Sequence, residues 1–187
     1  VSFRFLRDGE LKLHSPGSGD LRAAIHAVYG SGVVSGLIPV EYQTQAVTVS
    51  GYISKPQYAR GTRGMENFFV NTRYIRSKTC MAALEEAFHT YLITGKFPVC
   101  VLNVQLNPML VDVNVHPAKI EVRFSNEKSV FDAVFHGCRQ ALEQSDLTVA
   151  AQMETGAPAS ARINLANLEY DRAVKPQQTI WQQAEKP

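Results

Sequence analysis

The sequence is poor in cysteine, and the few cysteines it has form no recognisable pattern. Three of its 187 residues are cysteines, an odd number without a C-x-x-C pair. Cys80, Cys100 and Cys138 each stand in an apolar or helical context, which is more typical of buried free thiols than of disulfides or metal ligands. Such usage indicates a reducing, cytosolic setting. Four of the five histidines, His14, His26, His89 and His136, have no ligand-like spacing either.

Long apolar runs and familiar phosphate-binding loops are also missing. No window approaches 18 uncharged apolar residues, and the first residues hold no run of signal-peptide length, so neither a membrane span nor export is expected. The glycines at 30–32 and 61–64 match neither G-x-x-x-x-G-K-[ST] nor a strand-to-helix G-x-G-x-x-G. The net charge of +2 is too small to indicate a partner, whereas 45% hydrophobic residues suffice for one well-buried core.

The N-terminal third of the chain predicts a hairpin, a helix and two strands. Asp8-Gly9 separates two short alternating apolar runs, which is a strong hairpin signal. Asp20 can cap a helix that Gly30 ends. The strands expected next run over 33–42 and 46–54.

The remainder predicts further strands and two longer helices. The expected elements are a basic loop over 55–64, an extended segment over 67–75, a helix capped by Ser77 and running to about Thr94, a central strand over 97–106, and a last helix capped by Ser125 with Val130, Val134, Phe135, Cys138 and Leu142 facing inward. From Leu147 the pattern fades, which predicts a mostly disordered linker. The predicted class is α+β, a mostly antiparallel sheet with helices packed on one face.

The segment from Leu110 to Phe124, LVDVNVHPAKIEVRF, carries the clearest single pattern. Apolar and polar residues alternate on both sides of His116-Pro117, which predicts two half-buried strands. Pro117 has no amide hydrogen for a sheet and belongs in the bend, where its ring fixes the corner. Lys119 is then the first side chain after that corner. Pattern alone predicts an ordinary solvated lysine.

Two motifs resemble those of a known family. The run D-V-N-V-H-P-A-K followed by E-V-R-F resembles the signature of the MutL family of DNA mismatch-repair proteins, which are GHKL ATPases. Asn67 to Lys78, NFFVNTRYIRSK, resembles the same family's F-V-N-x-R segment. The resemblance implies the end of an ATPase domain over 1–30, a transducer domain over 31–146 and a linker over 147–187. It also implies a left-handed βαβ crossover, as in a ribosomal protein and the GHMP kinases, against the general right-handed rule.

The resemblance gives Lys119 a role that pattern alone does not. It implies that Lys119 contacts the terminal phosphate of ATP held in an upstream domain, aimed by the His116-Pro117 corner. Such a bond contributes roughly 1.5 to 3 kcal/mol, whereas reversing a 1:99 equilibrium needs about 5.5 kcal/mol. A dimer interface upstream must therefore add the rest. ATP and Mg²⁺ are expected in the full-length protein; this chain lacks the GHKL motifs and is expected to be an inactive fragment that binds neither tightly.

Positive charge gathers between Gly51 and Cys80, where six bases face one acid, Glu66, a local net of +5. A charge run is usually a solvated face, but the resemblance makes this stretch a candidate for non-specific DNA binding through phosphates. Five contacts would give a salt slope of about −3.5 for single strands or about −4.5 for duplex. The candidate residues are Arg60, Arg63, Arg73, Arg76 and Lys78.

The expected function is that of a regulatory transducer, which couples ATP binding in an upstream domain to DNA binding and to mismatch-recognition and strand-nicking proteins. The full-length protein is expected to be a dimer, cytoplasmic and nucleoid-associated, without a membrane partner. Two other interpretations stay open. An RNA-binding module of ribosomal type would need exposed aromatics, and Tyr58, Phe68 and Phe69 are the candidates. The transducer of a type II topoisomerase should carry a Q-T-K loop, and the sequence Q-T-Q at 43–45 lacks the lysine.

Overall fold

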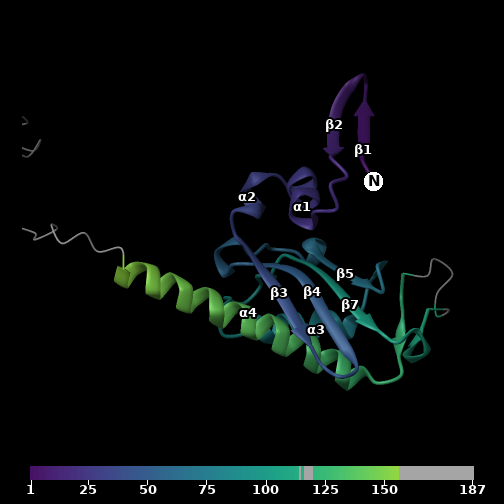
Figure 1. Ribbon diagram of the computed structural model, residues 1–187, viewed down its shortest axis with the longest axis vertical. Coiled ribbons are helices and arrows are strands. Elements are labelled where there is room, and N and C mark those ends of the chain that lie inside the picture. Colours follow the sequence, from purple (N-terminus) through teal and green to yellow (C-terminus); the bar gives the residue numbers. More distant parts are fainter. Residues whose placement is uncertain (114, 116–119, 156–187) are drawn as a thin grey trace, which may run out of the picture. The chain divides into compact units, whose positions relative to one another are not determined.

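A five-stranded sheet and two long helices dominate the computed structural model (Figure 1), which describes residues 1–113, 115 and 120–155 and the side chains among them up to 146. The strands are β1 (Phe3–Arg7), β2 (Glu10–Ser15), β3 (Leu37–Gln43), β4 (Val47–Ser54), β5 (Glu66–Val70), β6 (Arg73–Ile75), β7 (Cys100–Leu106), β8 (Val111–Asp112) and β9 (Arg123–Phe124). The helices are α1 (Leu21–Tyr29), α2 (Ser31–Val34), α3 (Lys78–Phe88) and α4 (Glu127–Thr155).

The sheet has the strand order β3-β4-β7-β5-β6. All neighbours are antiparallel except β5 and β7, which are parallel. The predicted α+β class with a mostly antiparallel sheet is therefore confirmed, and the apolar strand β7 lies inside the sheet as predicted. Because α3 falls between β5 and β7 in the chain, this parallel pair contains the expected crossover. Its left-handedness stays a prediction.

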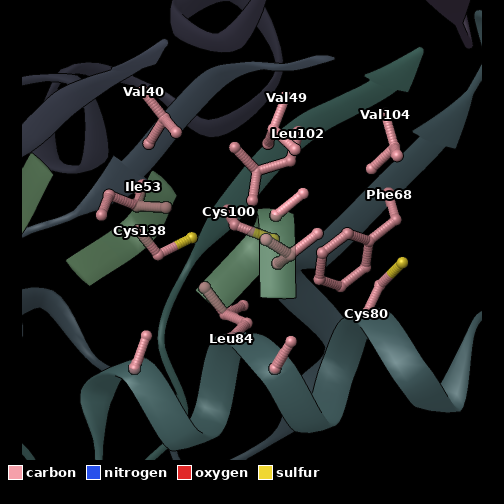
Figure 2. Packing of buried hydrophobic residues seen from close by; sticks show 14 of the residues in the cluster. Val40, Val49, Ile53, Phe68, Cys80, Leu84, Cys100, Leu102, Val104 and Cys138 are labelled. Carbon is pink, nitrogen blue, oxygen red and sulfur yellow. The ribbon is translucent and has the colours of Figure 1, made fainter. Parts of the chain in front are cut away.

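One face of the sheet carries the larger core, which α3 and α4 cover (Figure 2). Full burial of an aliphatic or phenylalanine side chain of this kind contributes about 1.5 to 3 kcal/mol. Gly137 lets α4 approach β3 closely, since a Cβ at this position would come within 2.9 Å of the Tyr42 side chain. The buried residues labelled in Figure 2 are Val40, Val49, Ile53, Phe68, Cys80, Leu84, Cys100, Leu102, Val104 and Cys138.

The opposite face carries a second, smaller core, so the prediction that helices pack on one face holds for α3 and α4 but is wrong for α1 and α2. Ile25 of α1 and Val33 of α2 are buried in a cluster with Val101 of β7. Val101 precedes Leu102 of the larger core, and successive side chains of a strand point to opposite faces. Both faces of the central strand are therefore covered, which explains its near-continuous apolar sequence.

Local turn and cap chemistry confirms several expectations. Asp8 and Gly9 have φ of 54° and 79°, the left-handed conformation of a tight hairpin turn between β1 and β2. The Asp20 side chain accepts a hydrogen bond from the Arg22 amide at 2.9 Å, and Gly30 ends α1 with φ 77°. Ser77 caps α3 by accepting from the Cys80 amide at 3.2 Å.

Other boundaries were wrong. Val33 and Val34 belong to α2 rather than to the start of a strand, and α3 ends at Phe88 rather than near Thr94. The segment 67–75 is not one extended run but part of the hairpin β5–β6, which turns at Asn71 and Thr72 with φ of 47° and 70°.

The C-terminal half departs from prediction as well. Asn126, not Ser125, caps α4, since its side chain accepts from the Ser129 amide at 3.0 Å. This helix continues to Thr155, so 147–155 are helical where a linker was expected. Within the described residues of the segment 110–124, the two predicted strands are reduced to the two-residue pair β8 and β9. Among the described residues, no helix is both long and apolar enough to cross a membrane.

Candidate nucleic-acid interface

The edge strand β6 and the first residue of α3 carry three exposed cations. Arg73 begins β6, Arg76 follows its last residue, and Lys78 is the first residue of α3. Among the described residues, β6 has β5 as its only sheet neighbour and is an edge strand of the sheet. No ion pair of Arg73, Arg76 or Lys78 occurs within the described part of the chain. Their charges are therefore available to a partner.

Arg60 and Arg63 belong to the connection from β4 to β5, which short 3₁₀ turns and a bridge hold in place. The Arg60 amide donates to the Phe97 carbonyl and the Phe97 amide to the Arg60 carbonyl, both at 2.8 Å. The side chains of Arg60 and Arg63 are both exposed. The basic loop predicted from the sequence is thus tied by its backbone to the segment before β7.

Arg63 is already engaged within the protein. Its Nε and Nη2 donate to the two carboxylate oxygens of Glu85 on α3, at 2.5 and 3.0 Å, and its guanidinium lies 4.3 Å from the centre of the Phe97 ring. The hydrogen bond to Glu85 raises the pKa of Arg63. A guanidinium held in a bidentate pair and stacked on a ring is less available to DNA than the cations of β6.

Glu66, the first residue of β5, lies buried beside this pair. It is only 7% exposed, and neither carboxyl oxygen has a hydrogen-bond partner. The pKa of Glu66 is raised from 4.5 to about 8, mainly by burial and in smaller part by the charge of Glu85, while the charge of Arg63 opposes the rise. At neutral pH this side chain is therefore mostly a neutral carboxylic acid, since a buried unpaired charge is disfavoured.

A pocket of about 250 Å³ connects Glu66 with the basic residues. Arg63 and Arg76 line it together with Glu66, although they are far apart in the sequence. Phe68, Ile75 and Met81 are among its apolar lining residues. The structure thus brings Arg63 and Arg76 to one pocket, and the other predicted contacts, Arg60, Arg73 and Lys78, do not line it.

Lys119, His116 and Pro117 lie outside the described residues, so their roles stay predictions. The ends of their segment are described. Val111 and Asp112 pair with Phe124 and Arg123, and the Ile120 carbonyl accepts a hydrogen bond from the Arg76 amide at 2.6 Å. Residue 120 is thus fixed to the end of the basic edge.

Glu66 and Glu85 are the residues that sequence reasoning missed. Glu66 stood out as the single acid in a basic stretch, and its alternation with Phe68 and Val70 places it on the inward side of β5. That spacing was the available signal. Glu85 gave none, because its meeting with Arg63 depends on how α3 packs.

The aromatic residues do not support base stacking. Phe68 is 1% exposed, Phe69 is half-buried in the smaller core, and the Tyr58 hydroxyl lies 3.1 Å from that of Ser35. The exposed platform required by the RNA-binding interpretation is not formed by these residues.

Comparisons with known proteins agree with this fold. The profile of the family described as "DNA mismatch repair protein, C-terminal domain" matches residues 25–143. A solved structure titled "Crystal Structure of N terminal domain of a DNA repair protein" is similar with a TM-score of 0.65 and 24% identity, over 80% of this chain and 50% of that one. This likeness supports the fold alone.

The chain belongs to this DNA mismatch repair family. Among its relatives, DNA mismatch repair protein MutL of Geobacillus kaustophilus is 41% identical over 160 residues, which are 84% of this chain and 25% of that protein. MutL of Desulforudis audaxviator is 44% identical over 144 residues, 77% of this chain and 26% of that protein. The resemblance to MutL is thereby confirmed, and the chain spans about a quarter of the length of these relatives.

Proposed function

We propose that this chain is the transducer part of a MutL-like mismatch-repair protein and that its basic edge binds DNA phosphates. The observation that carries the proposal is the run of exposed cations Arg73, Arg76 and Lys78 along the edge strand β6 and the start of α3. Flexible, exposed cations attract phosphates without regard to base sequence. Arg60 is a further contact, and Arg63 contributes less because Glu85 holds it.

The test is the salt dependence of DNA binding. Fluorescence anisotropy with a labelled single-stranded oligonucleotide should give an affinity that falls steeply between 50 and 200 mM salt. The triple variant Arg73→Ala, Arg76→Ala, Lys78→Ala should bind weakly, with a salt slope shallower by about 2, since each lost contact removes about 0.7 for a single strand.

A matched control removes a cation elsewhere. Lys12 of β2 is engaged by Glu10, so Lys12→Ala should leave both affinity and slope close to the wild type. Equal effects of the two changes, or an affinity indifferent to salt, would contradict phosphate binding at the basic edge.

We further propose that the edge is linked to nucleotide through the segment that contains Lys119. In this proposal, Lys119 contacts the terminal phosphate of ATP bound with Mg²⁺ in an upstream domain. The support is the family motif around Lys119 and the bond from the Arg76 amide to the carbonyl of Ile120, one residue later. A displacement of this segment would reach Arg76 directly. Partner proteins for mismatch recognition and strand nicking, and a dimer, belong to the same proposal.

The test requires the full-length protein. DNA affinity is measured with ATP, with ADP and without nucleotide, in the wild type and in Lys119→Ala. We expect a nucleotide effect in the wild type that is reduced in the variant, together with lower ATP turnover. Identical nucleotide responses would exclude this role for Lys119.

A further inference from the structure

The carboxyl of Glu66 is a buried hydrogen-bond acceptor that has no donor. Its carboxyl is buried at the wall of the 250 Å³ pocket, and both oxygens lack hydrogen-bond partners. Buried polar atoms in folded proteins are nearly always paired, so an unpaired carboxyl next to cationic side chains requires an explanation. A pocket below drug-ligand size leaves space for one side-chain group.

The charged groups around the pocket come from several elements. Arg63 precedes β5 and is held by Glu85 of α3, and both act electrostatically on Glu66. Arg76 follows β6 and lines the same pocket. On β7, burial raises the pKa of the Cys100 thiol well above its usual value, and the charge of Glu66 adds to this rise. The thiol therefore stays neutral.

Of the two arginines, Arg76 is the one that can change partner. Arg63 donates two hydrogen bonds to Glu85, and its guanidinium lies over the face of the Phe97 ring. Arg76 is exposed and forms no ion pair within the described residues. A long side chain at the rim can turn inward to a carboxylate or outward to solvent.

We propose that Glu66 is a positioning residue for DNA binding: its ionised carboxylate draws the Arg76 guanidinium into the pocket, and its neutral form leaves Arg76 free for a DNA phosphate. This inference rests on the proposed function of the basic edge. Phosphate and Glu66 then compete for one cation. DNA binding consequently favours the protonated form of Glu66 and takes up a proton.

The sign and size of the effect follow from linkage. The pKa of Glu66 is about 8 in the folded protein, so the neutral form dominates at pH 7 and the ionised form at pH 9. If only the neutral form has Arg76 available, DNA affinity falls with rising pH, by at most about tenfold between pH 7 and 9. The remaining cations set the affinity that is left.

The experiment compares pH profiles of DNA affinity. Anisotropy with a labelled oligothymidylate is measured at pH 7, 8 and 9 and constant ionic strength for the wild type, Glu66→Gln and Glu86→Gln. Glu86 is exposed and next to Glu85, so its variant makes the same Glu-to-Gln change without touching the pocket. The wild type and Glu86→Gln should lose affinity several-fold over this range, whereas Glu66→Gln should stay nearly constant. Arg76→Ala should also lose the pH-dependent part.

The outcomes separate this inference from the proposed function. A pH profile of Glu66→Gln that matches the wild type, with DNA binding intact, overturns the role of Glu66 alone. Absence of salt-sensitive DNA binding in every protein overturns the proposed function and this inference with it. A second measurement needs neither DNA nor a variant: the Arg76 Nε–H NMR signal of the wild type should change between pH 7 and 9. A constant signal overturns the inference.

Discussion

The buried carboxyl of Glu66 predicts an unusual dependence of stability on pH. The pKa of an unfolded glutamate is near 4.5, and burial raises that of Glu66 to about 8 in the folded state. Between these values the folded protein holds a proton that the unfolded chain has released. The contribution of Glu66 is therefore most favourable below pH 4.5, declines as pH rises, and levels off above pH 8.

The magnitude follows from the same values. At about 1.36 kcal/mol per pKa unit, the full difference corresponds to roughly 5 kcal/mol. Because a pocket adjoins Glu66 and water can relieve part of the charge, we expect roughly 2 to 4 kcal/mol. Glutamine keeps the shape of the neutral acid without titrating. The stability advantage of Glu66→Gln over the wild type should thus grow by this amount between pH 5 and pH 9.

The assay is urea unfolding followed by circular dichroism at pH 5, 7 and 9. The midpoint of Glu66→Gln should move above that of the wild type as pH rises, with unchanged slope. Glu86→Gln, an exposed glutamate, should run parallel to the wild type. Parallel profiles for Glu66→Gln and the wild type would refute the reasoning, because they would mean that Glu66 titrates alike in both states.

Two further predictions concern the core and a turn. Thr72 is a β-branched residue at φ 70°, a conformation that costs an L-residue roughly 1 to 2 kcal/mol. Thr72→Gly should therefore raise the free energy of unfolding, measured in urea melts, by about 1 kcal/mol. A loss of stability would contradict the strained turn. The three cysteines, Cys80, Cys100 and Cys138, are buried, and burial raises the pKa of the Cys80 thiol to about 11. A thiol reagent at pH 8 should therefore react with them only at the rate of unfolding. Rapid labelling of the native protein would contradict this core.

The features predictable from the sequence were those with local causes. Asp8-Gly9, Asp20 with Gly30, and Ser77 each act on neighbouring backbone, and the structure confirms them. The turn at Asn71-Thr72 was missed because threonine is a rare choice at positive φ. The hydrophobic alternation showed which strand residues face inward.

Features that depend on packing between distant segments could not be predicted. The pair of Arg63 and Glu85 joins residues 22 positions apart through the placement of α3. The second core exists because α1 and α2 cover the other face of β7, which the apolar sequence of that strand allows but does not require. The exposed cations Arg73, Arg76 and Lys78 were predicted as a group, whereas the pocket that Arg76 shares with Arg63 and Glu66 depends on how separate segments pack.

The location of DNA on the protein is tested most directly by an NMR titration. Backbone amide signals of this chain are followed as a single-stranded oligonucleotide is added at low salt. The account predicts that the largest shifts fall on residues 73–78 and decline as salt is raised, while the β1–β2 hairpin and the exposed face of α4 change little. Largest shifts on the opposite edge strand β3, around residues 37–41, would contradict the basic edge as the DNA-binding surface.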